Sequence, residues 1–120
     1  YQSSYFEYIN TSNPDEMIGR LYLDLKQKGY INCSRTIFKS IFIKGKNPEK
    51  VNWLETQSSF YYFIKSLTGK KNINCSNKWV VASDCFLVKG KEQDSIQLGK
   101  VKEPTHRIKQ EINNILQVFL

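Results

Sequence analysis

The apolar pattern that most constrains the fold lies in the middle of the chain. Phe60, Phe63, Ile64 and Leu67 recur at spacings of three and four residues, which places them on one face of an α-helix. Gly69 follows, where such a helix would end. Apolar residues at helical spacing recur in four further segments, at residues 14–28, 34–42, 79–90 and 105–119. We therefore expect a mainly α domain of about five helices.

Capping residues predict where some of these helices begin and end. Asn13 can cap a first helix whose first turn contains Pro14, and Gly29 is placed to end that helix. Asn52 and Glu55 have the three-residue spacing of a capping box. They predict that the central helix begins directly after Asn52.

The helices organise the 120 residues into a single domain with three parts. Residues 1–13 have no helical period and are expected to form an extended arm. Residues 14–103 form the basic helical core, and residues 104–120 form the terminal helix. Within the core, the polar segment 91–103 is expected to hold a short extended piece at 96–101.

One four-residue sequence, Ile-Asn-Cys-Ser, occurs at residues 31–34 and again at 73–76. Each copy follows a helix that ends in glycine and lysine, and each precedes another helix. The isoleucine would fill the corner between two helices, and the asparagine or serine would cap the second helix. Two interpretations stay open, a duplicated helix-turn-helix unit or a coincidence between similar turns, because repeat arrays usually contain three or more copies.

Three cysteines without CxxC spacing, Cys33, Cys75 and Cys85, argue against a disulfide framework and a zinc site. We expect free thiols in a reducing compartment, and hence a cytoplasmic protein. The chain has no run of 18 uncharged apolar residues, so no membrane partner is expected.

Positive charge is concentrated in the middle of the chain. Between Lys26 and Lys91 there are thirteen lysines and arginines against three acids, a local net charge of +10. The remainder carries five bases and eight acids, a net of −3, so the total is +7. Such a basic stretch is typical of polyanion-binding surfaces. Codon bias toward an AT-rich genome is an alternative source of the lysines, since Ala82 is the only alanine.

Eight cations are the candidate DNA-binding residues. Arg35 and Lys39 lie four residues apart on the helix expected at 34–42, which a helix-turn-helix would place in the major groove. The other six candidates are in loops and near helix ends: Lys44, Lys46, Lys50, Lys70, Lys71 and Lys78. The alternative is a solvated lysine face. Because arginine, the commonest reader of guanine, is scarce, binding is expected mostly at phosphates and to be strongly salt-dependent.

Aromatic residues and the terminal helix support a second hypothesis, a protein–protein interaction module. We expect Phe60 and Phe63 in the core, with Tyr61 or Tyr62 at its edge, although these rings could also stack on bases. Two tryptophans, Trp53 and Trp79, are expected to anchor loops to the core. The terminal helix carries an apolar face that suits either the core or a homodimer interface, formed by Ile108, Ile112, Ile115 and Phe119.

No catalytic site is predicted. His106 is the only histidine, and its place at a helix start favours a surface position. The chain has no HExxH, glycine-rich phosphate loop or serine-histidine-aspartate pattern. We therefore expect a non-enzymatic protein without a cofactor.

Several spaced aromatic and glycine motifs occur in a recognisable order. They are Gly29-Tyr30-Ile31, Gly45-Lys46, Val51-Asn52-Trp53, Tyr62-Phe63-Ile64, Lys78-Trp79, Cys85-Phe86 and Lys89-Gly90-Lys91. In this order they resemble the C-terminal region of RteC-type regulators, which are encoded on conjugative elements of Bacteroidetes. The resemblance covers about Met17 to Lys91 and transfers no individual DNA-contacting residue.

The resemblance to RteC-type regulators implies a helical, helix-turn-helix or winged-helix-like domain. It also implies DNA binding and a role in transcription regulation of a mobile genetic element. A winged helix would place a short β-hairpin at 86–98, with its turn at or near Lys89-Gly90-Lys91.

Overall fold

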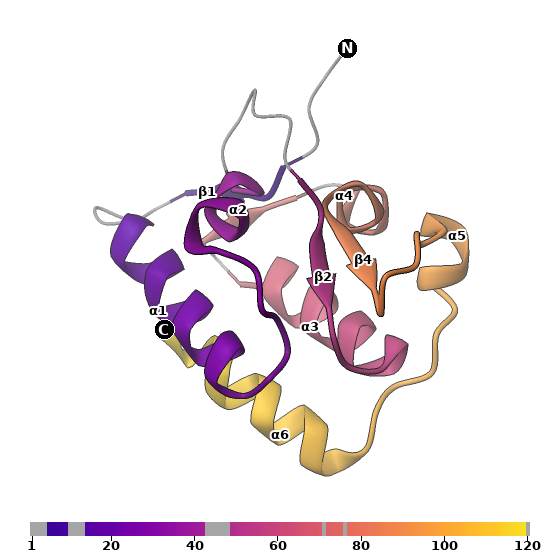
Figure 1. Cartoon of the computed structure of the whole chain (residues 1–120). Coiled ribbons are helices and arrows are strands. Elements are labelled where there is room, and N and C mark those ends of the chain that lie inside the picture. Colours follow the sequence, from indigo (N-terminus) through magenta and orange to yellow (C-terminus); the bar gives the residue numbers. More distant parts are fainter. Residues whose placement is uncertain (1–4, 10–13, 43–48, 71, 76, 120) are drawn as a thin grey trace.

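The computed structural model describes residues 5–9, 14–42, 49–70, 72–75 and 77–119 (Figure 1). The described chain is mainly helical, as predicted. Its helices are α1 (Pro14–Gln27), α2 (Arg35–Ser40), α3 (Gln57–Thr68), α4 (Lys78–Cys85), α5 (Ser95–Leu98), α6 (His106–Ile115) and a final 3-10 turn, η1 (Leu116–Phe119). Its strands are β1 (Glu7–Tyr8), β2 (Val51–Trp53), β3 (Ile73–Asn74) and β4 (Phe86–Val88).

The strands form two small two-stranded sheets. β1 pairs antiparallel with β3, with Glu7 opposite Asn74. β2 pairs parallel with β4, with Val51 opposite Phe86 and Trp53 opposite Val88. A parallel pair needs a long crossover connection, and here the crossover contains α3, β3 and α4.

Each copy of the repeated Ile-Asn-Cys-Ser sequence lies between two helices. The order α1–α2–β2 is followed by α3–β3–α4–β4, and only the second copy contributes a strand, β3. Ile31 and Ile73 are both buried, which confirms that isoleucine fills each corner. Ser34 caps α2 by accepting a hydrogen bond from the Ile37 N–H, whereas Ser76 is outside the described residues.

Trp53 lies at the centre of an aromatic core and is fully buried. Its ring centroid is 4.8 Å from that of Phe63, 5.0 Å from that of Tyr30 and 5.7 Å from that of Phe60. Its indole Nε1 donates a hydrogen bond of 3.0 Å to the Ser59 hydroxyl, which satisfies the buried donor. The predicted core positions of Phe60 and Phe63 are confirmed.

The described part of the N-terminal arm is extended, as predicted, but it is also part of the core. The Phe6 side chain is fully buried and lies against the rings of Phe42 and Phe86. The Phe6 N–H donates to the Ile41 carbonyl at 2.9 Å. Phe6 therefore ties the arm to the residues directly after α2 and to β4.

The predicted capping box at Asn52 is wrong. Val51 and Trp53 are both buried on one side of an extended segment, so burial favours a strand there. The Asn52 side-chain oxygen accepts a hydrogen bond of 2.8 Å from the Gly90 N–H. The cap of α3 is instead Thr56, which accepts a bond from the Ser59 N–H.

The segment after α4 also differs from the prediction. The helix expected to continue to about Gly90 ends at Cys85, because the next three residues pair with β2. Lys89 and Gly90 have φ values of 52° and 77° and form the expected tight turn, closed by two 3.0 Å hydrogen bonds between Val88 and Lys91. The hairpin extends no further than that pair.

Residues 95–98 form α5 where we expected an extended piece. The Asp94 carboxylate accepts hydrogen bonds from the Ile96 and Gln97 N–H groups, and so caps this short helix. The feature of the sequence that indicates α5 is therefore Asp94, a residue type that commonly caps helices.

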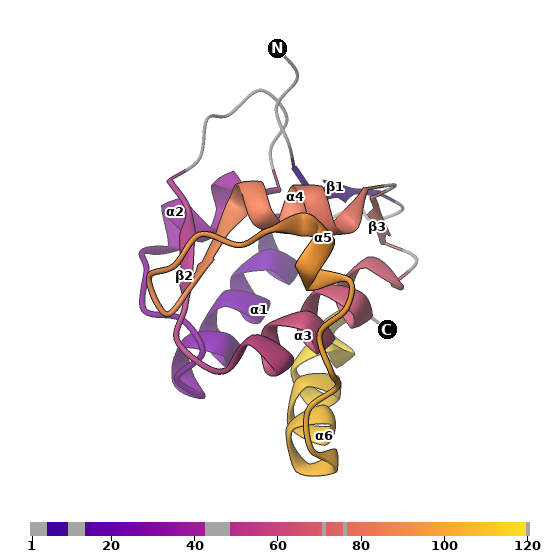
Figure 2. The same ribbon diagram turned by 90° about the vertical axis from the view of Figure 1, so that its right-hand side faces the viewer.

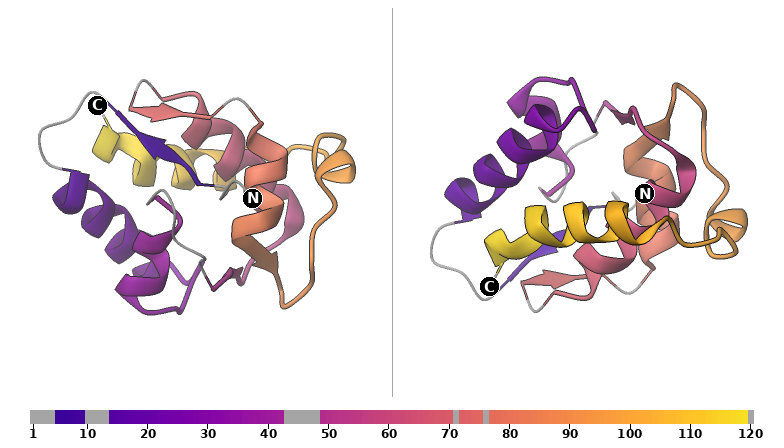
Figure 3. Two further views of the ribbon diagram at one scale, coloured as in Figure 1. Left: turned by 90° about the horizontal axis from the view of Figure 1, so that it is seen from above. Right: turned by 90° about the horizontal axis from the view of Figure 1, so that it is seen from below.

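The terminal helix packs onto the domain. α6 lies across α1 and α3, on the side seen in the right-hand view of Figure 3. Ile112, Ile115 and Leu116 are buried there, and Ile108 is partly buried. The core alternative is thus confirmed for Ile108, Ile112 and Ile115, while the Phe119 side chain is outside the described part of the chain. A homodimer through this apolar face would first have to unpack it. Within the described chain, no helix combines the length and hydropathy needed to cross a membrane.

Candidate nucleic-acid interface

Two helices with candidate cations lie along the same side of the molecule. α2 and α4 occupy the upper edge in both Figure 1 and Figure 2, together with β1, and the left-hand view of Figure 3 looks onto them. Arg35 and Lys39 belong to α2, and Lys78 is the first residue of α4. Lys50 precedes β2 and donates a hydrogen bond to the Ser83 carbonyl of α4. We call this surface the α2–α4 side.

The two cations of α2 lie against the first half of α1. The Lys39 ammonium is 2.7 Å from the Asp15 carboxylate, and both side chains are partly exposed. A Cβ on Gly19 would collide with Arg35, since it would lie 3.0 Å from Cζ and closer still to Nη2. Gly19 therefore provides the space for the Arg35 guanidinium beside α1. Arg35 remains exposed to solvent.

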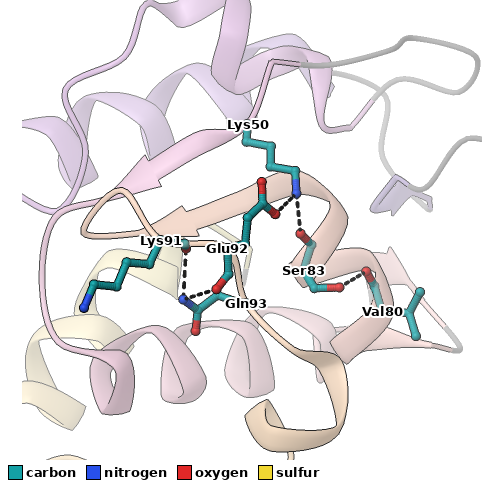
Figure 4. Close-up of polar contacts among 6 residues, drawn as sticks. All are labelled: Lys50, Val80, Ser83, Lys91, Glu92 and Gln93. Atoms are coloured by element: carbon teal, nitrogen blue, oxygen red, sulfur yellow. Dashed lines mark hydrogen bonds and ion pairs between the residues drawn. The ribbon is translucent and has the colours of Figure 1, made fainter.

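Lys50 connects three segments through its ammonium group (Figure 4). It pairs with the Glu92 carboxylate and donates a 3.1 Å bond to the Ser83 carbonyl. Gln93 binds the carbonyls of Lys91 and Glu92 and so holds the same loop. Lys50 thus has a structural role that the sequence did not reveal.

Acids from the flanking segments neutralise part of the basic middle. Asp15, Glu92 and Glu103 lie outside residues 26–91, and they pair with lysines at 39, 50 and 65. Because of these pairs, positive and negative charges are less separated in the folded protein than they are along the sequence. Exposed pairs of this kind contribute little net stability, so a phosphate can compete for their lysines.

The remaining candidate cations differ in their surroundings. Among the residues that the structure describes, Arg35, Lys70 and Lys78 have no ion pair with a carboxylate. Lys70 follows the C-cap of α3, and Lys78 lies 5.5 Å from the centroid of the Trp79 ring. Three candidates, Lys44, Lys46 and Lys71, are outside the described residues.

An aromatic pair beside Lys78 was not predicted as a site. Tyr61 and Trp79 stack with ring centroids 5.1 Å apart and planes inclined by 10°. The Lys65 ammonium lies 5.8 Å from the Tyr61 centroid. Two features of the sequence were available: Tyr61 and Lys65 are four residues apart, and Lys78 is next to Trp79. Neither feature indicates that the packing of α3 against α4 brings the rings of Tyr61 and Trp79 together.

A pocket of about 300 Å³ opens between the start of α4 and α5. It is lined by Asn77, Lys78, Trp79, Val80, Ser95 and Ile96. Val80 and Ile96 are 46% and 67% exposed, so the pocket combines an aromatic ring, aliphatic side chains and one cation.

A second pocket, of about 340 Å³, lies between α1 and α6. Its lining includes Asp24, Lys28, Arg107 and Glu111, with charges of both signs. Because the charges that line this pocket are of both signs, the pocket has no preference for a polyanion. The Tyr30 hydroxyl donates a 2.7 Å bond to Glu111 at this pocket, and burial with that bond raises the tyrosine pKa.

The single histidine and the cysteines have ordinary environments. His106 is exposed at the first position of α6, which confirms its predicted surface position. Cys33 and Cys75 are half-buried thiols, and Cys85 is a buried thiol. Burial raises the pKa of Cys85 to about 12 and also raises the pKa of the other two thiols. All three are therefore expected to stay protonated and poorly nucleophilic at neutral pH.

Glu103 provides an acid-sensitive contact between α3 and α6. It accepts hydrogen bonds from Lys109 and Lys65, which lower its pKa to about 2. Its folded-state pKa is below the value of about 4.3 expected in the unfolded chain, so ionised Glu103 stabilises the fold above about pH 4.3. That stabilisation is lost as the pH falls through about 2.

We expect Glu103→Gln to lower the melting temperature near neutral pH and to have progressively less effect in acid, since the wild-type carboxylate is then protonated. Thermal unfolding of both proteins between about pH 6 and pH 2 measures the difference. A difference that stays constant with pH would show that the carboxylate charge is not responsible.

The chain was compared with protein-family models, curated proteins and solved structures, and none of them matches it.

Proposed function

We propose that this chain is a non-enzymatic DNA-binding module that uses the α2–α4 side. The observation that carries the proposal is that α2 and α4, which lie along the same edge of the molecule in Figures 1 and 2, both contain candidate cations: Arg35 and Lys39 in α2, and Lys78 in α4. Lys50 also contacts α4, through its bond to the Ser83 carbonyl. Cations on two such helices suit the phosphate backbone, which supplies most of the affinity in non-specific DNA binding.

The acids near this surface limit the expected affinity. Asp15 and Glu92 each occupy one lysine, and Asp84 adds a further exposed carboxylate on α4. A DNA phosphate would replace the carboxylates at Lys39 and Lys50 at small cost, because both pairs are partly exposed. We therefore expect weak, salt-sensitive binding. A role in transcription regulation of a mobile element, as the resemblance to RteC-type regulators implies, belongs to the same proposal.

The experiment compares two variants that lose the same charge. Arg35→Gln/Lys39→Gln changes the α2–α4 side, and Lys100→Gln/Lys102→Gln changes two exposed lysines after α5. Fluorescence anisotropy with labelled random-sequence duplex and single-stranded DNA, over a series of salt concentrations, gives the slope of log K against log salt. Each lost phosphate contact should reduce that slope by about one, so the first variant should lose about two.

The control variant should keep the wild-type slope. If both variants lose affinity equally, only the net charge matters and the α2–α4 side is not the interface. If the wild-type protein binds neither DNA at low salt, the DNA-binding proposal fails. The protein–protein interaction alternative would then be favoured, and a partner bound through apolar contacts should respond little to salt.

A further inference from the structure

The pocket at the start of α4 has a wall that is held in place before any ligand binds. Tyr61 lies against one face of the Trp79 indole, with the planes inclined by only 10°. Gly99 approaches the indole edge, since a Cβ there would be 3.3 Å from Nε1. Two neighbours, one on α3 and one directly after α5, therefore fix the orientation of the Trp79 ring, which lines the pocket.

The other lining residues complete a site with a flat apolar wall and polar edges. Val80 and Ile96 expose aliphatic surface, while Asn77 and Ser95 carry groups that can donate and accept hydrogen bonds. The volume, about 300 Å³, is at the lower end of the range of small-ligand pockets. A planar ring with hydrogen-bonding edges fits this combination better than a charged side chain does.

Charge decides between the possible occupants. The lining includes Lys78 and no acid, and the neighbouring Asp94 carboxylate is engaged with the first amides of α5. The Lys78 ammonium now lies 5.5 Å from the Trp79 centroid, on a flexible stem that can turn to a nearby phosphate. An aromatic ring beside a cation is the arrangement that binds single-stranded nucleic acid, by stacking and by phosphate contact.

We propose that this pocket is a stacking site for one unpaired base of single-stranded DNA, with Lys78 contacting the adjacent phosphate. This inference rests on the proposed DNA-binding function and adds that the pocket binds single-stranded DNA. Paired bases are stacked within a duplex and cannot reach the pocket, so the site should distinguish single strands from duplexes.

The experiment uses a short oligothymidylate and a duplex of equal length at one salt concentration. Trp53 is fully buried, so quenching of tryptophan emission on binding reports on Trp79. We expect the single strand to quench emission, and the duplex to bind without quenching. Trp79→Leu should weaken single-strand binding roughly tenfold and leave duplex binding unchanged, whereas Trp79→Phe should keep most of the affinity.

A matched pair of exposed aliphatic residues tests the pocket without touching the indole. Ile96 lines the pocket, and Leu23 is a similarly exposed residue of α1 outside it, at 67% and 58% exposure. Ile96→Ser should reduce single-strand affinity, and Leu23→Ser should not. Equal effects of the two changes would overturn the inference.

The outcomes also separate this inference from the function on which it rests. Duplex binding combined with unchanged single-strand binding by Trp79→Leu would overturn the stacking site and leave the DNA-binding proposal intact. No binding of either DNA by the wild-type protein would overturn both. Quenching by an apolar peptide but not by the oligothymidylate would assign the pocket to a protein partner instead.

Discussion

Replacing Trp53 with alanine should cost about 3–5 kcal/mol of unfolding free energy, a large share of the 5–15 kcal/mol typical of a folded domain. The indole is fully buried and lies within 6 Å, centroid to centroid, of Tyr30, Phe60 and Phe63. Its removal leaves a cavity that these rings can fill only in part. It also removes the hydrogen bond that the Ser59 hydroxyl oxygen accepts, so that this buried hydroxyl keeps only its bond to the Thr56 carbonyl.

Urea unfolding followed by far-ultraviolet circular dichroism measures this loss without relying on the missing tryptophan. Trp53→Phe should cost less than Trp53→Ala, because the smaller ring retains most of the contacts. Leu23→Ala, at an exposed position on α1, should stay within about 0.5 kcal/mol of wild type. A loss below about 1 kcal/mol for Trp53→Ala would mean that Trp53 is not the centre of the core.

Phe6→Ala should cost a similar amount, about 3–5 kcal/mol, although Phe6 lies near the N-terminus, directly before the two-residue strand β1. The side chain is fully buried against Phe42 and Phe86, and its backbone N–H bonds to Ile41. The loss would appear in the same urea experiment. The neighbouring Tyr5 is only partly buried, so Tyr5→Ala is the matched control and should cost less.

Hydrogen exchange tests the same segment in the unmodified protein. The N–H groups of Phe6 and Ile9 donate to carbonyls of Ile41 and Asn72, and both should exchange slowly. Fast exchange at both positions, together with a small effect of Phe6→Ala, would indicate a frayed arm.

Local periodicity predicted the helices well where one face is apolar. The spacing of Phe60, Phe63 and Leu67 placed α3, and Gly29, with its φ of 82°, ends α1 as expected. The buried face of α6 followed from the same reasoning. Each of these features depends on residues within a few turns of one another, so a single sequence contains the necessary information.

Features that depend on distant residues were not predictable in this way. Residues 51–53 and 86–88 are strands because each pairs with the other, and neither segment alone is long enough to show the alternation of a strand. The ion pairs that neutralise Lys39 and Lys50 join residues far apart or on different elements. The stack of Tyr61 on Trp79 likewise requires the packing of α3 against α4.

The parallel pairing of β2 with β4 has a consequence for how the chain folds. These three-residue strands are too short to be stable apart, so neither the unit α1–α2–β2 nor the unit α3–β3–α4–β4 can complete its core without the other. Bringing β2 and β4 together costs chain entropy before their pairing can stabilise the fold. Folding should therefore be slower than that of a simple helical bundle. The two units should therefore melt together in one transition, without a half-folded species.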